Sequence, residues 1–406
     1  MNNAKNTTLF PYLERLLEGE EVQWKTLGEV AEFKRGQTIT QKTAQAGVYP
    51  VISGGQQPAY YIDQYNQTGQ TITVAGSGAY AGFVMFWNEP IFVSDAFSIK
   101  ANEEVLLPRY VFHFLLNKQS SIFNLKKGVG VPHVYAKDLA VFSIPIPPLC
   151  VQARIVEILD KFTQLEAELE AELEARKKQY AYYRDQLLNF SQCPPLNVNI
   201  EWKTLGEVCH IVGRIGFRGY TRNDIVERGE GAISISPTNI INQHLNLSAE
   251  INTYISWEKY DESPEIKIEI GDIVLVKTGS TVGKTAIVRE LIEKATINPQ
   301  MVVLKEIQCS PAYLSHYIIT PYFQLKLKSL CGQGSVPNIS QTKLSTIPIP
   351  LPPLSEQRRI VDILDRFDTL MNSISEGLPK EIALRRKQYE YYRDALLNFP
   401  RAEVTA

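Results

Sequence analysis

Cysteine is scarce in this sequence, and the few histidines are dispersed. Among 406 residues there are five cysteines and five histidines. The cysteines are odd in number and never spaced as Cys-x-x-Cys, which excludes a zinc ribbon and a disulfide framework that pairs all of them. No two histidines have the spacing that would place both on one helix face as metal ligands. We therefore expect a reducing compartment, no disulfide framework and no metal site.

Long apolar runs and a strong net charge are missing too. No segment approaches the length of a membrane span, and the N-terminal segment lacks the apolar core of a signal peptide. We expect a cytoplasmic protein with no membrane association. Lys and Arg number 42 against 44 Asp and Glu, for a net charge of −2. The whole molecule is therefore not attracted to nucleic acid, and any affinity for DNA has to come from a local patch or from partner subunits.

The sequence also lacks the motifs of enzymes that act on DNA or nucleotides. GSTVGKT at 279–285 has three residues between its glycines, whereas a phosphate-binding loop has four. Asn298 and Pro299 are followed by Gln300, not by the second proline and the aromatic residue of an adenine methyltransferase. We expect no catalysis by this chain and interpret 279–285 as a tight turn. An NTPase that uses Lys284 remains the alternative from another class.

What the sequence does contain is a long internal repeat. WKTLGEV occurs at 24–30 and at 202–208, and IPIPPL at 144–149 returns as IPIPLPPL at 347–354. RKKQYAYYRDQLLNF at 176–190 is matched by RRKQYEYYRDALLNF at 385–399. Between these matched ends the two middle segments barely resemble each other. This pattern predicts a duplicated scaffold that holds two different binding domains; ancient duplication followed by drift is the alternative.

We expect four regions, namely a globular domain at 1–150, a helix at 151–190, a second globular domain at 191–354 and a second helix at 355–399. Both domains alternate short β-like runs with glycine-rich turns and end in a short helix, at Leu107 to Asn117 and at Pro311 to Ile319. The predicted fold class is therefore α+β, with mixed domains of irregular β-sheet.

Both long helices carry a stripe of apolar and aromatic residues spaced by three and four, as in a coiled coil. In the first helix the stripe consists of Ile155, Leu159, Phe162, Leu169, Leu173, Tyr180, Tyr183 and Leu187. In the second it includes Ile360, Leu364, Phe367, Tyr389, Tyr392 and Leu396. The second helix has four additional residues, with Gly377 and Pro379 among them, and the proline should kink or break it. We expect the two helices to pack antiparallel and to set the spacing of the domains; a dimerisation coiled coil is the alternative.

Basic and amide-bearing loops are the candidate DNA contacts, because Arg and Gln can bond base edges while Lys holds phosphates. In the first domain the candidates are Lys34, Arg35, Gln37, Gln56, Gln57, Tyr60, Tyr80, Lys126, Lys127 and His133. In the second domain they are Arg214, Arg218, Tyr220, Arg222, Lys277, Ser280, Thr281, Lys284, Gln333, Ser335 and Asn338.

The repeated framing segments resemble the conserved regions of type I restriction-modification specificity subunits. The resemblance is clearest in PPLSEQRRIVDILD at 352–365, and it spans nearly the whole chain twice. In the first copy Cys150-Val151-Gln152-Ala153 departs from the Ser-Glu-Gln-Arg form, so the two elbows need not act identically. A two-domain DNA-binding scaffold outside restriction, such as an orphan subunit paired with a lone methyltransferase, is the nearest alternative.

This resemblance implies a non-catalytic subunit with two target-recognition domains, each reading one half of a split double-stranded DNA sequence. The helices would set the spacing and dock two adenine-N6 methylation subunits, which restriction subunits then join. S-adenosylmethionine, ATP and Mg²⁺ would belong to those partners, with no cofactor on this chain.

Overall fold

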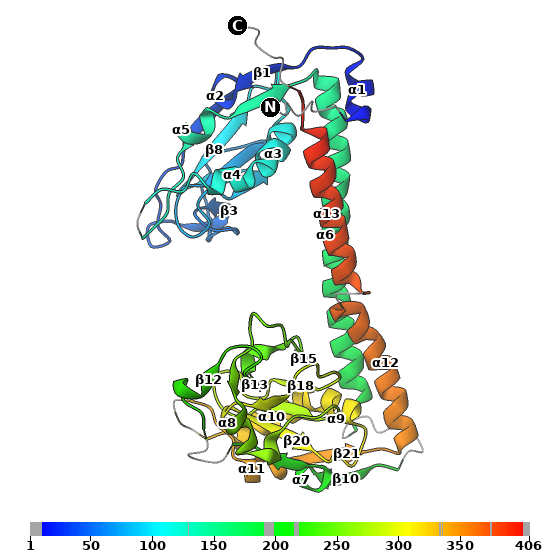
Figure 1. Cartoon of the computed structure of the whole chain (residues 1–406). Helices are drawn as coiled ribbons and strands as arrows, with labels where there is room; N and C mark the ends of the chain where they lie inside the picture. Colours follow the sequence, from blue (N-terminus) through cyan, green and yellow to red (C-terminus); the bar gives the residue numbers. More distant parts are fainter. Residues whose placement is uncertain are drawn as a thin grey trace, which may run out of the picture. The chain divides into compact units, whose positions relative to one another are not determined.

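The computed structural model describes residues 10–128, 130–190, 199–214, 219–332, 334, 336–373 and 376–400 (Figure 1). The chain forms two compact units, and each combines a globular domain with part of the long helices. Unit 1 consists of Met1–Glu170 and Glu381–Ala406, and unit 2 of Ala171–Lys380.

Three small sheets build the globular part of unit 1. A four-stranded sheet has the order β2-β8-β5-β6, a three-stranded sheet the order β4-β3-β7, and β1 pairs with β9. The strands are β1 (Gln23–Thr26), β2 (Ala31–Arg35), β3 (Ala46–Ile52), β4 (Tyr61–Ile62), β5 (Thr71–Ala75), β6 (Val84–Trp87), β7 (Phe92–Val93), β8 (Ala96–Ala101) and β9 (Ser143–Ile146). The helices are α1 (Pro11–Leu17), α2 (Leu27–Val30), α3 (Pro108–Asn117), α4 (Gln119–Phe123), α5 (Ala136–Ala140) and the first part of α6 (Leu149–Leu187), with α13 (Leu378–Leu396) from the other end of the chain.

Unit 2 repeats this arrangement. Its main sheet has the order β11-β20-β17-β18, its second sheet the order β12-β16-β13-β19, and β10 pairs with β21. The strands are β10 (Glu201–Thr204), β11 (His210–Val212), β12 (Ile225–Val226), β13 (Gly231–Ile235), β16 (Tyr254–Ser256), β17 (Ile273–Val276), β18 (Thr285–Ile287), β19 (Ala295–Ile297), β20 (Met301–Lys305) and β21 (Pro348–Leu351), with an extra hairpin of β14 (Ile240–Ile241) and β15 (His244–Leu245). The helices are the later part of α6, α7 (Leu205–Val208), α8 (Trp257–Asp261), α9 (Pro311–Ile318), α10 (Pro321–Leu330), α11 (Gln341–Ser345) and α12 (Leu354–Asn372). Among the described residues, 3-10 turns lie at Arg222–Asp224, Pro237–Asn239 and Pro264–Ile266. The predicted mixed α and β architecture, present twice, is confirmed.

The repeated WKTLGEV segment encodes the same switch from strand to helix in both units. Thr26 caps the single turn of α2, because its backbone N–H and its hydroxyl both donate to Glu29 Oε2 at 2.6 Å. Thr204 makes the same pair of hydrogen bonds to Glu207 Oε2 at 2.7 Å. Such a capping box satisfies donors that the first turn of a helix leaves free. The identity of the two segments therefore has a local structural cause.

The second long helix is broken where the proline predicted it. α12 ends at Asn372 and α13 begins at Leu378, with Pro379 as its second residue. Proline is tolerated in the first turn because the backbone donor that it lacks would have no partner there. α6 contains neither glycine nor proline and is continuous over 39 residues.

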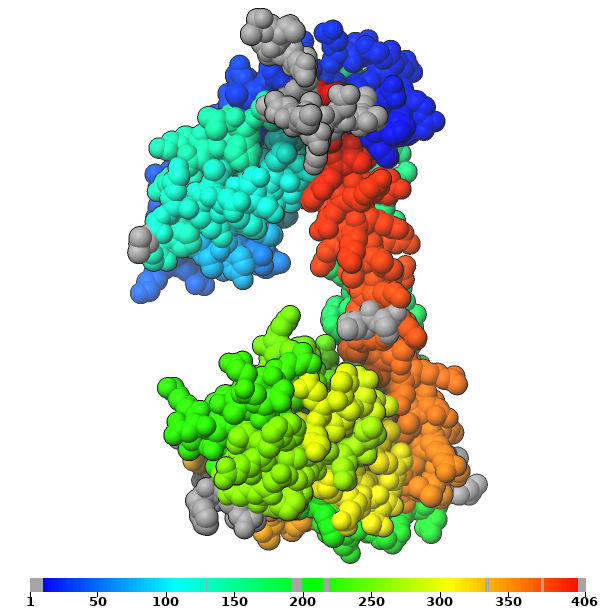
Figure 2. All heavy atoms as spheres, viewed as in Figure 1, coloured from blue at the N-terminus to red at the C-terminus, as the bar shows by residue number. Residues whose placement is uncertain are grey.

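Each unit contains an antiparallel pair of long helices. In unit 1, Phe162 of α6 stacks on Tyr392 of α13 at 5.2 Å between ring centroids. Further along α6, Glu166 and Glu170 both accept hydrogen bonds from Arg386. The side chains of α13 (red) cover this part of α6 (green) in Figure 2. In unit 2, the later part of α6 packs on α12, where Tyr183 stacks on Phe367 at 5.7 Å.

The predicted apolar stripe is buried at the domain ends of the helices and less so between them. Ile155, Leu159, Ile360 and Leu364 are fully buried in the two main cores. Leu169, Leu173 and Leu187 are half-buried, and Tyr183 is 40% exposed although it stacks on Phe367. Tyr180, Tyr389 and Leu396 are buried, and Phe162, Phe367 and Tyr392 pack against the cores. The helices are therefore held mainly by the globular domains that they contact.

The two proline-rich elbows act alike despite their different sequences. Gln152 is fully buried, and its amide donates to the carbonyls of Val105 and Pro147 at 2.9 and 2.8 Å and accepts from Leu107 N at 2.9 Å. Gln357 donates to Pro352 O at 2.8 Å and accepts from Ser310 N at 3.0 Å. The glutamine is the shared residue that matters here, so the substitution of Ser-Glu by Cys150-Val151 leaves this contact in place.

Candidate nucleic-acid interface

Four loops converge at one place in unit 1, namely 53–57, 76–82, 94–95 and the described residues 126–128 and 130–133. Backbone hydrogen bonds join them: Gly78 N donates to Pro132 O at 3.0 Å, and Gly76 N donates to Asp95 O at 3.1 Å. Gly54 lies so close to the second loop that a Cβ there would be 2.5 Å from Ser77 O. We call this set of segments the loop cluster of unit 1.

Unit 2 builds the same loop cluster from 236–239, 277–284, 298–300 and the described residues 332, 334 and 336–338. Gly279 N donates to Pro337 O at 2.9 Å, and Lys277 N donates to Gln300 O at 2.8 Å. These bonds correspond one to one with those of unit 1. The Nζ of Lys284 donates to Pro237 O at 2.9 Å, which joins the first loop to the second. The backbone framework of the two clusters is therefore shared, although the side chains on it differ.

Both clusters are centred on the G-x-x-x-G turn that the sequence predicted. Gly78 and Gly82 have φ of 86° and 85°, and Gly279 and Gly283 have φ of 108° and 92°. These values lie in the left-handed region that favours glycine. A glutamine side chain is hydrogen-bonded to each turn: Gln119 Nε2 donates to Gly82 O at 2.8 Å, and Gln324 Nε2 donates to Gly283 O at 3.0 Å. Residues 279–284 thus form a turn, as predicted, and Thr285 begins strand β18.

Most of the predicted DNA-contact residues lie in these clusters. The exposed members are Gln56, Gln57, Tyr80, Lys127, Ser280, Thr281 and Asn338. The half-buried members are Lys126, His133, Lys277 and Lys284. Gln37 is also exposed, and its backbone N–H donates to Val93 O beside the cluster of unit 1. The predicted residues Arg218, Gln333 and Ser335 lie outside the described residues.

The lysines of the clusters are partly engaged within the protein. Lys126 Nζ donates to Ala79 O at 2.9 Å, and Lys127 forms an ion pair with Asp138 at 2.8 Å. Burial lowers the pKa of Lys277 below its ordinary value. His133 stacks on Tyr135 at 6.2 Å between ring centroids. The clusters therefore present amides, hydroxyls and aromatic rings more than free positive charge.

Several residues that the sequence analysis assigned to binding loops have other positions. Lys34 and Arg35 are exposed residues of strand β2, not of a loop. Arg214 is only 5% exposed; its Nε donates to Ile297 O at 2.8 Å, and its guanidinium lies over the ring of Tyr220. A guanidinium this buried contributes to the fold, and the assignment of Arg214 to DNA contact stays a prediction.

Tyr60 and Arg222 are the remaining candidates. The Tyr60 hydroxyl donates to Ile39 O at 3.0 Å, and its ring is half-buried. Arg222 is exposed, in a 3-10 turn that Thr221 caps. No described contact brings either residue into a loop cluster.

Asp95, Gln300 and Ser77 are exposed or half-buried cluster residues that sequence reasoning missed. The sequence signal that could have identified Asp95 and Gln300 was their shared position directly before a strand, β8 and β20 respectively.

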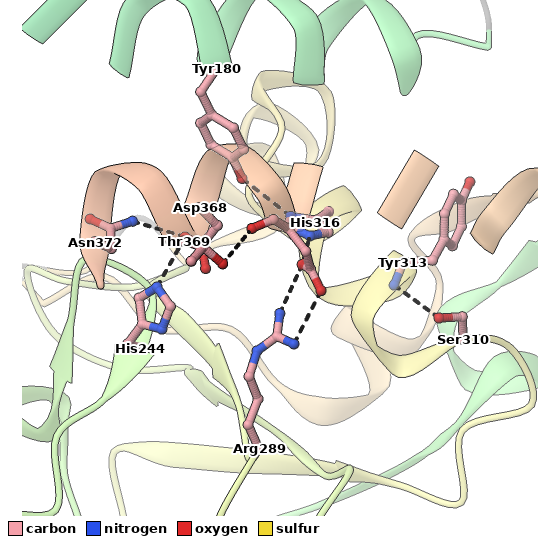
Figure 3. Close-up of polar contacts among 10 residues, drawn as sticks. Tyr180, His244, Arg289, Ser310, Tyr313, His316, Asp368, Thr369 and Asn372 are labelled. Carbon is pink, nitrogen blue, oxygen red and sulfur yellow. Dashed lines mark hydrogen bonds and ion pairs between the residues drawn. The ribbon is translucent and has the colours of Figure 1, made fainter. Parts of the chain in front are cut away.

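A second repeated constellation joins each globular domain to the long helices, and Figure 3 shows the one in unit 2. In unit 2, His316 Nε2 lies 2.8 Å from Asp365 Oδ1 of α12, and His316 Nδ1 lies 3.2 Å from the hydroxyl of Tyr180 of α6. Arg289 bonds both oxygens of Asp365. Here the histidine and the aspartate come from the second repeat and the tyrosine from the first.

Unit 1 contains the reciprocal arrangement. His113 Nε2 lies 2.7 Å from Asp160 Oδ1, and His113 Nδ1 lies 3.0 Å from the hydroxyl of Tyr389. Arg109 bonds the same carboxylate. Burial lowers the pKa of His113, and its contacts with Asp160 only partly oppose this effect. We call these two constellations the interlocks. Their histidines were described as dispersed in the sequence. Each lies five residues after the proline that begins its helix, which was the available sequence signal.

Unit 2 has one further anchor to its helix. His244 of the β14–β15 hairpin bonds Asp368 of α12 at 3.0 Å, and Asn372 donates to the same carboxylate oxygen at 2.9 Å (Figure 3). Burial raises the pKa of Asp368, but the hydrogen bonds and charge of His244 outweigh it, so the net pKa is lowered.

The described part of the chain contains neither a membrane-crossing helix nor a candidate metal site. No helix there is long and apolar enough to cross a membrane, and no group of three or more His, Cys, Asp or Glu residues is placed to hold a metal ion.

The family model and the relatives that match this chain all point to one family. Residues 19–175 and 197–384 match the family described as type I restriction modification DNA specificity domain. The chain is 34% identical over 417 residues to the type I restriction enzyme EcoR124I/EcoR124II specificity subunit of Escherichia coli, covering 97% of this chain and 98% of that protein. It is 31% identical to a putative type I restriction enzyme specificity subunit of Haemophilus influenzae, over 96% of this chain and 98% of the relative.

Two solved structures share the fold. One is the type I restriction-modification system S subunit from M. genitalium, with a TM-score of 0.56, 16% identity and coverage of 94% of this chain and 97% of that one. The other comes from a study of complex assembly and conformational transition of the type I R-M system, with a TM-score of 0.58, 20% identity and coverage of 93% and 98%. With two matched domains and full-length relatives, the chain belongs to the family of type I restriction-modification specificity subunits.

Proposed function

We propose that this chain is the DNA-recognition subunit of a type I restriction-modification complex and that each loop cluster reads one half of a split target. The observation that carries the proposal is the loop cluster itself, which is built twice on matching backbone hydrogen bonds but with different side chains. A shared framework with different side chains is what two readers of different half-sites require, because hydrogen-bonding groups on base edges specify sequence.

The side chains of the clusters suit base contact better than phosphate contact. Gln56, Gln57 and Asn338 carry amides, and Ser280 and Thr281 carry hydroxyls, all of them exposed. These groups both donate and accept, so they can match the patterns that base pairs present in the major groove. Most of the phosphate-binding charge would then come from partner subunits, in keeping with the net charge of −2.

In this proposal the chain is non-catalytic and acts in the cytoplasm. Two adenine-N6 methylation subunits, and restriction subunits in the full complex, supply the chemistry and hold S-adenosylmethionine, ATP and Mg²⁺. The long helices are the proposed docking surface for the methylation subunits. Tyr182 and Tyr391 support this role, because they occupy equivalent positions of the repeated segment and are 62% and 63% exposed. Exposed aromatic residues are enriched at protein interfaces.

The decisive experiment is single-molecule methylome sequencing of a host that carries this chain with its methylation subunit. We expect a split motif with N6-methyladenine on both strands, and its loss when the chain is deleted. Exchange of residues 200–354 for the matching domain of another specificity subunit should change one half-site only. A methylome that does not depend on the chain would overturn the proposal.

The spacing role has a separate test. A helical insertion of four residues after Glu170, about one turn of α6, should change the number of unread base pairs and leave both half-sites unchanged. An altered half-site sequence would contradict a pure spacing role.

The docking role is tested by co-purification with the methylation subunit. The double variant Tyr182→Ala and Tyr391→Ala should lose most of the bound subunit. Tyr61→Ala, which removes an exposed tyrosine from a globular domain, is the matched control and should retain it.

A further inference from the structure

Two equivalent positions in the loop clusters carry side chains of different hydrogen-bonding capacity. Asp95 in unit 1 and Gln300 in unit 2 each directly precede an inner strand of the main sheet, β8 or β20. The carbonyl of Asp95 accepts from Gly76 N, and the carbonyl of Gln300 accepts from Lys277 N. The strand register also makes the two positions equivalent, because Ala75 pairs with Ala96 in unit 1 and Val276 pairs with Met301 in unit 2.

We infer that Asp95 and Gln300 are specificity-determining residues, each reading one base pair of its own half-site. This inference rests on the proposed function and names base-reading residues within it. The carboxylate of Asp95 would select a base with an exposed amino group, and the amide of Gln300 would select adenine.

The surroundings of Asp95 keep its carboxylate accessible. A Cβ at Gly54 would lie 3.7 Å from Oδ2, and one at Gly76 would lie 3.5 Å from Oδ1. Both neighbours are glycines, so no side chain of theirs covers the carboxylate. Ser77 donates its hydroxyl to Oδ2 and orients the group. No hydrogen bond from the described residues reaches Oδ1, so this oxygen can accept one from a base.

The charge of Asp95 is not neutralised within the described residues. No ion pair joins Asp95 to any of them, and the nearby lysines are engaged elsewhere, Lys126 with Ala79 O and Lys127 with Asp138. An exposed carboxylate next to DNA is repelled by phosphates. It is favourable only where it accepts a hydrogen bond from an amino group, which in the major groove means N4 of cytosine or N6 of adenine. Guanine O6 and N7 and thymine O4 are acceptors and would be rejected.

Gln300 presents a side chain that both donates and accepts. It is exposed, and its Nε2 would lie 3.8 Å from a Cβ at Gly279, at the edge of the turn. Asn298 donates one long hydrogen bond of 3.4 Å to Oε1 and accepts from Gln300 N at 3.0 Å. Both hydrogens of Nε2 and one lone pair of Oε1 remain free of these contacts. A glutamine with both groups available forms a bidentate pair with N6 and N7 of adenine.

The test uses the assembled complex of this chain with its methylation subunit, and the probe is the host genome read by methylome sequencing. Asp95→Asn keeps the size of the side chain and replaces an acceptor by a donor. We expect methylation at the wild-type first half-site to fall by roughly 10- to 100-fold, with relaxed or altered preference at one base pair and an unchanged second half-site. Gln300→Glu should alter one base pair of the second half-site only.

Matched variants separate reading from general effects. Asp63→Asn removes another exposed carboxylate of unit 1 and should leave both half-sites unchanged. An unchanged half-site beside an altered one also reports that the complex is folded. If Asp95 faced phosphates, Asp95→Asn would instead strengthen binding to every sequence, and that result would overturn the inference.

The remaining outcomes are distinct from failure of the proposed function. A wild-type motif that persists unchanged in Asp95→Asn and Gln300→Glu would overturn this inference and leave the proposed function intact. A wild-type complex that methylates no motif would overturn both.

Discussion

The hydroxyl of Tyr180 and Nδ1 of His316 lie 3.2 Å apart, although 136 residues separate them in the sequence. The reciprocal pair, Tyr389 and His113, is 3.0 Å apart. In both interlocks Nε2 faces a carboxylate, which can only accept, so Nε2 donates. In unit 1, burial lowers the pKa of His113, so its ring is neutral and accepts the hydroxyl of Tyr389 at Nδ1. Each repeat thus supplies the tyrosine that completes the buried site of the other.

Loss of one interlock hydroxyl should destabilise the protein. Tyr389→Phe leaves His113 Nδ1 buried without its donor, which costs about 1 to 3 kcal/mol of unfolding free energy. For a unit of this size the midpoint temperature should fall by several degrees, roughly 2 to 4 °C per kcal/mol. Thermal unfolding followed by circular dichroism measures this change. Tyr391→Phe, on the exposed side of the same helix, is the control, and equal effects of the two changes would contradict the role of the interlock.

The stability of unit 1 should decrease in mild acid. Burial holds the pKa of His113 below its ordinary value, so the unfolded chain binds the proton more readily than the folded chain. The unfolding free energy should therefore fall as the pH drops below about 6.5. Urea unfolding at about pH 7.5 and about pH 5.5 tests this.

His113→Gln isolates this effect because glutamine does not titrate. Partial burial raises the pKa of Asp160, but the hydrogen bonds of His113 and Arg109 outweigh it, and the net pKa is lowered. The stability that Asp160 provides is therefore present above about pH 4 and is lost only below that range. A pH dependence between neutral and mildly acid conditions that is the same in His113→Gln and in the wild type would refute the assignment.

The turn glycines should resist substitution. Gly82→Ala places a Cβ at φ 85° and 3.0 Å from Ile122 Cγ2, and Gly283→Ala places one at φ 92° against Gln324. Strain of this kind costs about 1 to 3 kcal/mol. Gly55→Ala is the matched control, because its φ is not left-handed and its nearest contact is at 3.5 Å. Chemical denaturation of the three variants should separate Gly55→Ala from the other two; equal stability would show that the turn tolerates a side chain.

Arg214 should affect stability more than sequence recognition. Arg214→Met removes the donor to Ile297 O and the contact with Tyr220, for an expected loss of about 1 to 3 kcal/mol. Arg222→Met removes an exposed arginine and should be nearly neutral for folding. Denaturant unfolding compares the two, and the methylated motif should be the same in both. A changed motif with unchanged stability in Arg214→Met would reverse this view.

The sequence by itself determined the duplicated plan, because the signals involved are local or periodic. WKTLGEV contains its own capping box, Thr26 with Glu29 and Thr204 with Glu207. The spacing of Ile155 and Leu159 predicted a buried helix face, and Pro379 predicted the break between α12 and α13, since proline cannot continue a helix interior. The two G-x-x-x-G turns could be predicted from their glycines, because glycine adopts positive φ more readily than other residues.

Only the tertiary structure decided which residues share a site. Backbone hydrogen bonds join Gly78 to Pro132 and Gly76 to Asp95, although these loops are far apart in the sequence. No local preference of the chain encodes such contacts. The burial of Arg214 and the pairing of His113 with Tyr389 likewise arise from packing of segments far apart in sequence. The side-chain type of a residue indicates what it can bond, but its partners and its exposure depend on how the whole chain packs.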